Sequence, residues 1–142
     1  MGEIKMLLSM LSRKEKLKFL DLAIHMVAVD GEATIYEKRI LNIMLAEVGD
    51  EIIKEYTFSL SSDLEETIDF FTQAPKPIRN VVLLNLFKIS MFDDLYNATE
   101  HFFLDNIRRQ FKISIAKRKE LMSLIYEERD LKEKARRACL SA

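Results

Sequence analysis

The fold of this chain is decided by residues 78–91, which read IRNVVLLNLFKISM. Apolar residues occur here at most positions, so a helix formed by this stretch would be apolar nearly all round. Such a helix is stable in water only when other elements cover it on every side. Pro77 precedes the stretch, and proline fits the first turn of a helix because the N–H that it lacks would have no partner there. The sequence therefore predicts a central, buried helix over 78–91.

Capping signals on both sides of this stretch predict the surrounding helices. Ser12 and Glu15 form a capping box, in which a hydroxyl and a carboxylate satisfy free N–H groups, and they predict a helix over 13–29. Gly49 marks the end of the next helix, because glycine readily adopts the left-handed conformation that closes one. Further start signals are Thr34 with Glu37, Ser62 with Glu65, Asn97 with Glu100, and Ser114. With short helices before Ser12 and over 50–58, we expect seven or eight helices.

The composition agrees with an all-α fold in a single domain. The chain has 142 residues, of which 49% are hydrophobic, and this fits one compact domain over 1–142. It has only 3 glycines and 2 prolines, fewer than the tight turns of a sheet-rich fold would need. No stretch alternates apolar and polar residues for long enough to predict a strand.

The same composition excludes several classes of protein. The net charge of −1 argues against a globally basic nucleic-acid-binding protein. No apolar run reaches the roughly 18 residues that a membrane span needs, and the start does not resemble a secretory signal, so we expect a cytoplasmic protein. The single cysteine excludes a disulfide framework. The common motifs for phosphate, nucleotide and nucleophile chemistry are absent, so we expect no enzyme.

An internal repeat relates the two halves of the chain. When the sequence is shifted by 63 residues, the identities that appear include Leu20 on Leu83, Asp30 on Asp93, Glu37 on Glu100, and Leu41 on Leu104. Each copy is an apolar helix that ends in aspartate, a short connection, and a capped helix with glutamate in its first turn. We place repeat 1 at about 15–58, repeat 2 at about 77–125 and a charged C-terminal tail at about 126–142. The duplication predicts two related helical hairpins about an approximate two-fold axis.

The repeated acids are the strongest candidate site in the sequence. In each copy the glutamate begins an otherwise apolar stripe with spacings of four, three and four residues, which places it on a core-facing side of its helix. Carboxylates held together in a partly dry place need a proton or a cation between them. A divalent cation of the calcium or magnesium type prefers oxygen ligands of this kind. The predicted ligands are Asp30, Glu37, Asp93 and Glu100, with Glu32 as a weaker candidate.

A plainer interpretation of the same acids stays open. Glutamate at the third position of a helix is what a capping box uses, and aspartate is common where a helix meets a loop. Glu37 and Glu100 would then only cap their helices. His25 and His101 lie near the predicted ligands, although a single histidine on a helix is more often a packed or surface residue than a metal ligand.

At these residues the chain resembles the TerB-like family, the helical domain associated with tellurite resistance. The segment Met26-Val-Ala-Val-Asp30-Gly31-Glu32, followed by Glu37, resembles the recurrent acidic motif of that family. The segment Met91-Phe-Asp93-Asp94, followed by Glu100, resembles its weaker second copy, and Phe111-Lys-Ile-Ser114 resembles the stretch that follows. The resemblance covers about residues 15 to 125.

The resemblance implies an all-helical fold of two related halves and a metal-binding centre at Asp30, Glu37, Asp93 and Glu100. Family members are linked to tellurite and other stress responses, and similar domains occur in membrane-associated and co-chaperone proteins. Asp94 stands where the family pattern has glycine, so the second half-site is altered or lost. We therefore expect a non-catalytic stress-response module that binds a divalent cation. The alternative is a metal-free scaffold for protein–protein interaction, with a protein partner or a second copy of this chain bound.

A basic patch gives a third hypothesis. Six basic residues lie within 108–119: Arg108, Arg109, Lys112, Lys117, Arg118 and Lys119. Acidic residues interrupt the further basic residues of the tail, and alternating signs are typical of a solvated helix face with ion pairs. The sharper interpretation is a docking surface for nucleic acid or another anionic surface.

Overall fold

The computed structural model describes residues 7–27, 42, 45–55, 63–91 and 98–141. Within these residues it contains helices and no strand, so the all-α prediction is confirmed for this part of the chain. The elements are η1 (Leu8–Met10), α1 (Arg13–Val27), α3 (Asp50–Glu55), α4 (Leu64–Thr72), α5 (Lys76–Met91), α6 (Ala98–Gln110) and α7 (Ile115–Leu140). The total of seven or eight helices and the duplication stay predictions, because residues 28–41 lie outside the described part.

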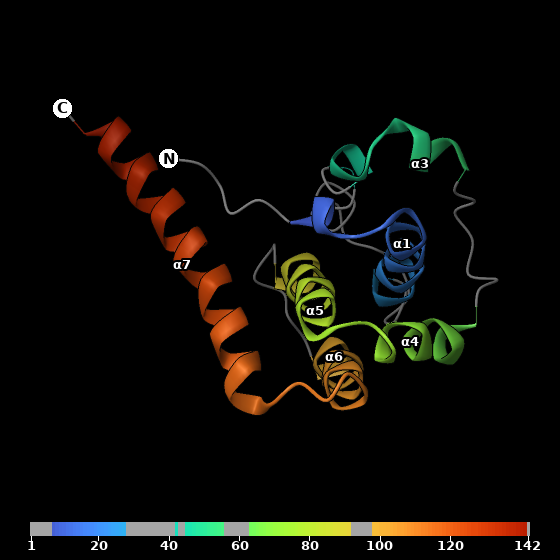
Figure 1. Ribbon diagram of the computed structural model, residues 1–142. Coiled ribbons are helices and arrows are strands. Elements are labelled where there is room, and N and C mark those ends of the chain that lie inside the picture. Colours follow the sequence, from blue (N-terminus) through green and yellow to red (C-terminus); the bar gives the residue numbers. More distant parts are fainter. Residues whose placement is uncertain (1–6, 28–41, 43–44, 56–62, 92–97, 142) are drawn as a thin grey trace.

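The central helix is α5, as the sequence predicts. Every side chain from Val81 to Met91 is buried. Helix α5 contacts η1, α1, α4, α6 and α7, and Figure 1 shows it in the middle of the arrangement. It begins at Lys76, two residues before the predicted start, because the Pro75 carbonyl accepts the N–H groups of Ile78 and Arg79. Pro77 occupies the first turn of α5, where its missing N–H leaves no gap.

The predicted helix caps are confirmed at two sites. The Ser12 N–H donates to Glu15 Oε1 at 2.7 Å and the Glu15 N–H donates to Ser12 Oγ at 3.2 Å, which is the reciprocal capping box. Ser114 Oγ accepts the Lys117 N–H at 3.0 Å at the start of α7. Helix α6 begins at Ala98, and its predicted cap Asn97 lies outside the described residues.

The predicted cap at Ser62 is wrong by one residue. The N-cap of α4 is Asp63, whose carboxylate accepts the Glu66 N–H at 3.2 Å. Aspartate is as good an N-cap as serine, and Asp63 also has a glutamate three residues later. Two overlapping capping patterns were therefore present, and the sequence pattern alone did not separate them.

Gly49 closes a helical segment, as predicted. Residues 45–48 are helical, and the Gly49 N–H donates to the Leu45 carbonyl at 3.4 Å. Gly49 has a φ of 102°, a conformation that side chains with a Cβ rarely adopt.

Helix α7 is continuous across the predicted start of the tail. It runs over 26 residues, so the boundary near residue 126 falls inside one helix. Its first half packs on α5 through Leu121 and Ile125, whereas every side chain over 134–140 is exposed. In Figure 1 the C-terminal end of α7 stands away from the other labelled helices. None of the helices in the described part, α7 included, is long and apolar enough to cross a membrane.

The corner between α6 and α7 contains a lysine in the left-handed conformation. Lys112 has a φ of 57°. The Lys112 N–H donates to the Arg109 carbonyl at 3.0 Å and the Ile113 N–H donates to the Arg108 carbonyl at 3.1 Å. This pair of bonds is the Schellman motif that closes many helices, in which glycine usually holds the position of Lys112.

We expect Lys112→Gly to stabilise the protein by about 0.5–1 kcal/mol, because glycine removes the steric cost of the left-handed conformation and only part of that gain is lost to chain entropy. Lys119→Gly, at an exposed position inside α7, is the matched control and should destabilise it by about 1 kcal/mol. Urea denaturation gives both free energies of unfolding. A loss of stability with Lys112→Gly would mean that the lysine side chain stabilises the fold by more than its left-handed backbone conformation destabilises it.

Candidate functional site

Of the five predicted metal ligands, the structure describes Glu100. Asp30, Glu32, Glu37 and Asp93 lie outside the described residues. Glu100 lies in the first turn of α6 and is only 4% exposed. Its carboxylate Oε2 accepts a hydrogen bond from Ser90 Oγ of α5 at 2.5 Å, and Ser90 is also buried.

The core-facing stripe of the second copy is confirmed. Leu104, Ile107 and Phe111, which follow Glu100 on one side of α6, are all fully buried. In the first copy Val48 is buried, as the same pattern predicts, and Leu41 and Met44 lie outside the described residues. Glu100 therefore stands at the head of a core stripe, which is an unusual place for an ionisable side chain.

The described residues contain no group of three or more histidine, cysteine or acidic side chains that could hold a metal ion. His25 and His101 are both partly buried. The His101 ring contacts Phe102 edge-on, with 5.9 Å between ring centroids. Because most of the predicted ligands lie outside the described part of the chain, the metal site stays a prediction.

A second polar feature, which the sequence analysis missed, joins α5 to α7. Lys88 Nζ of α5 lies 2.8 Å from Glu128 Oε1 of α7, and the two side chains are 10% and 9% exposed. Lys132 Nζ approaches the same Glu128 oxygen at 3.5 Å from the solvent side. The signal was present in the sequence: Lys88 is the one cation after Arg79 in the apolar stretch 78–91, and Glu128 continues the spacing of Leu121 and Ile125 along α7.

A groove of about 270 Å³ opens beside this ion pair. Apolar Met91 and Ile125 and the charged Lys88 and Glu128 line it, together with residues further along α7. At its edge the Arg129 guanidinium donates to the Met91 carbonyl at the end of α5. The groove is therefore bounded by contacts that fasten α7 to α5.

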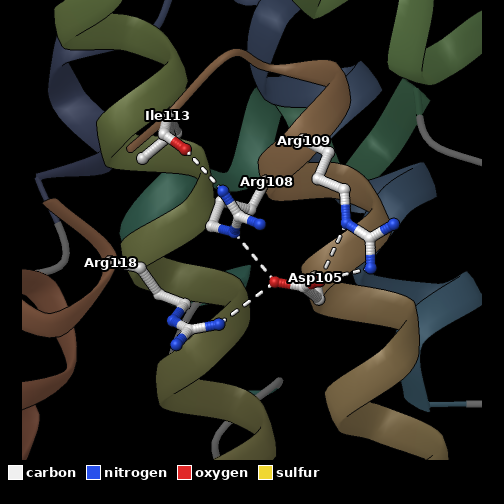
Figure 2. A network of polar contacts seen from close by, with 5 residues as sticks. All are labelled: Asp105, Arg108, Arg109, Ile113 and Arg118. Atoms are coloured by element: carbon white, nitrogen blue, oxygen red, sulfur yellow. Dashed lines mark hydrogen bonds and ion pairs between the residues drawn. The ribbon is translucent and has the colours of Figure 1, made fainter. Parts of the chain in front are cut away.

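A third cluster fixes the corner between α6 and α7, and Figure 2 shows it from close by. Asp105 Oδ1 accepts from Arg108 Nε at 2.8 Å and from Arg118 Nη1 at 3.1 Å, and Oδ2 accepts from Arg109 Nη2 at 2.7 Å. Arg108 Nη1 also donates to the Ile113 carbonyl at 2.9 Å. One carboxylate thus joins α6 to the first turn of α7.

In this cluster three of the six residues of the basic patch, Arg108, Arg109 and Arg118, form ion pairs. The same holds in the exposed half of α7, where Arg136 and Arg137 both pair with Glu133. The hydrogen bond from Arg136 lowers the pKa of the Glu133 carboxyl to about 2. Charges that already form ion pairs within the protein are less available to an external partner.

The pKa of Asp105 is lowered even further. The hydrogen bond from Arg108 is the main cause, and the bond from Arg109 and the charges of both arginines add to it, while partial burial opposes the shift. Asp105 is therefore ionised throughout the ordinary pH range.

Comparison with known proteins gives no relative: no family model, no curated protein and no solved structure matches this chain. The resemblance to the TerB-like family therefore stays a prediction.

We expect Glu128→Leu to destabilise the protein by about 3 kcal/mol, because it removes the carboxylate that compensates the buried ammonium of Lys88. Lys88→Met should cost less, since Glu128 keeps Lys132 as a neighbour. In a double-mutant cycle measured by urea denaturation, the double variant should be more stable than the sum of the single effects predicts. Additive effects would show that the pair does not interact energetically.

We expect Asp105→Asn to lose about 2 kcal/mol at pH 7, because the variant gives up charge-assisted hydrogen bonds to arginines. The lowered pKa means that the ionised carboxylate stabilises the fold above its unfolded pKa, near 3.8, and loses that effect as the pH falls through the folded value. The difference in the free energy of unfolding between Asp105→Asn and the parent should therefore be constant from pH 7 to about 5 and should shrink below about pH 4.

Glu120→Gln is the control for Asp105→Asn. Glu120 pairs with Lys117 at 2.7 Å, but both side chains are largely exposed, so the loss should stay below about 1 kcal/mol. Equal losses for the two variants would contradict a special role for Asp105.

Proposed function

We propose that this protein is a non-catalytic stress-response module of the TerB-like kind, which binds a divalent cation of the calcium or magnesium type. Its ligands would be Asp30, Glu37, Asp93 and Glu100, with Glu32 as an additional oxygen donor. The observation that carries the proposal is the burial of Glu100 at the head of a core stripe.

The burial of Glu100 favours a ligand over a simple cap. A glutamate that only caps a helix start can do so at the surface, where water solvates its charge. Glu100 is instead enclosed and accepts a bond from Ser90 on a neighbouring helix. A buried carboxylate held in place by a neighbouring helix is the kind of oxygen ligand that calcium and magnesium bind. A cation that reaches this end of α6 would meet a ligand already held in position.

The repeat in the sequence supplies the other half of the proposal. Because each copy carries the same aspartate and glutamate at the same separation, the two hairpins would bring related ligands to one ion. An ion shared in this way would fasten the hairpins together or change the surface that they offer to a partner. Carboxylate oxygens suit calcium and magnesium better than they suit softer metals.

A metal-free scaffold for protein–protein interaction is the second candidate, and the exposed half of α7 favours it. Leu131 and Leu140 are 42% and 72% exposed on that half of the helix, and Tyr126 is 44% exposed. A protein partner or a second copy of this chain could cover them. Nucleic-acid binding has the least support, because three arginines of the basic patch are already paired with Asp105.

Thermal melting separates the first two candidates. An ion that binds only the folded state stabilises it by RT ln(1 + [L]/Kd), which is about 2.7 kcal/mol at 100 times Kd and raises the melting temperature by roughly 5–10 °C. We expect a rise of this kind in calcium, magnesium or manganese relative to EDTA. Asp30→Asn, Glu37→Gln and Glu100→Gln should each reduce or abolish it.

The surface variant Glu120→Gln serves as the matched control and should keep the full response to the ion. If no ion changes the melting temperature of the parent protein, the metal-free scaffold becomes the better account. If the ion acts but Asp30→Asn and Glu37→Gln respond like the parent, the assigned ligands are wrong.

A further inference from the structure

A small pocket lies where the start of α5 meets the corner between α6 and α7. Its polar lining consists of Lys76, Arg79 and Asn80 from α5 and Lys112, Ser114 and Lys117 from the corner and α7. The pocket has a volume of about 170 Å³. Sites for drug-sized ligands usually measure about 300–1,000 Å³, so this one suits a small ion or the terminal group of a larger molecule.

The charge of the pocket has one sign. Four of its lining residues, Lys76, Arg79, Lys112 and Lys117, are cationic, and none is acidic. In the described part of the chain, Lys117 forms an ion pair with Glu120, which does not line the pocket. The described carboxylates form no ion pair with Lys76, Arg79 or Lys112. This separates the pocket from the rest of the basic patch, where the arginines are paired with Asp105.

Arg79 is partly buried, whereas Lys76 and Lys112 are exposed. Its Nη1 donates to the Phe111 carbonyl at the end of α6, which holds the guanidinium beside the corner. Its Nε is buried and has no hydrogen-bond partner among the described residues. A guanidinium that is partly removed from water without a counter-charge is costly, and an anion in the pocket would offset that cost.

We propose that this pocket binds a phosphate group. A phosphate carries more than one negative charge and several acceptor oxygens, which match three or four converging cations better than a single carboxylate does. The Asn80 amide and the Ser114 hydroxyl add neutral polar groups to the lining. The phosphate is either free in solution, as inorganic phosphate or a small monoester, or belongs to a lipid headgroup. The site is independent of the acidic residues of the proposed cation centre.

Calorimetric titration of the full chain with inorganic phosphate at low ionic strength tests the proposal. The parent protein should bind, and the affinity should fall as salt is added, because exposed charges are screened. The double variant Lys76→Gln/Lys112→Gln should bind at least about tenfold more weakly, since it removes two charge-assisted contacts. Both lysines are exposed, so this variant should keep its fold.

The control variant is Lys54→Gln/Lys119→Gln, which removes two exposed lysines elsewhere and leaves the pocket intact. It should bind phosphate as the parent does. Arg79→Gln should also lose binding, and its free energy of unfolding must be measured beside it because Arg79 also contacts Phe111. Amide chemical shifts that move on titration should cluster at residues 112–114.

Vesicles of phosphatidylcholine with and without phosphatidic acid distinguish the two sources of phosphate. Binding of inorganic phosphate without co-sedimentation assigns the site to a soluble phosphate. Co-sedimentation that needs phosphatidic acid, that inorganic phosphate reduces and that Lys76→Gln/Lys112→Gln abolishes assigns it to a lipid headgroup. The proposal is wrong if the parent binds neither probe, or if the pocket variant and the control variant bind equally well.

Discussion

The structure depends on the burial of α5, because the other helices pack around this one apolar element. Eleven consecutive residues from Val81 to Met91 are buried, which is possible only if neighbours cover the helix on all sides. Helices α1, α4, α6 and α7 supply that cover. The hydrophobic effect is strong but non-directional. It therefore explains why the other helices pack on α5, but it does not determine their order or their packing angles.

Polar contacts along α5 fix where α6 and α7 pack on it, which apolar contact alone does not do. Lys88 pairs with Glu128 on α7, and Ser90 donates a hydrogen bond to Glu100 on α6. Each of these two contacts fixes the position of α7 or α6 along the axis of α5. Near one end of α5, Arg79 donates to the carbonyl of Phe111, the residue that follows α6. At the other end, Arg129 of α7 donates to the Met91 carbonyl. A sliding movement of α6 or α7 along α5 would break these bonds inside a dry interface, where unpaired polar groups are expensive.

The corner between α6 and α7 combines structural and binding chemistry in a few residues. Asp105 pairs with three arginines and so joins α6 to the first turn of α7 (Figure 2). Lys112 and Arg79 form no ion pair with a carboxylate among the described residues, and both line the small pocket. The contrast explains why one stretch of basic sequence holds both a structural cluster and a candidate anion site.

The sequence by itself determined the central helix, the caps at Ser12 and Ser114, the stop at Gly49 and the core-facing side of α6, because each follows from residues within a few turns of one another. It did not separate Asp63 from Ser62 as a cap, since both satisfy the same local rule. Only the tertiary structure decided that Lys88 meets Glu128, that Ser90 meets Glu100 and that Arg79 lies against Phe111. These pairs lie 40, 10 and 32 residues apart in sequence, so their meeting depends on how the helices pack around α5, and local spacing contains no information about it.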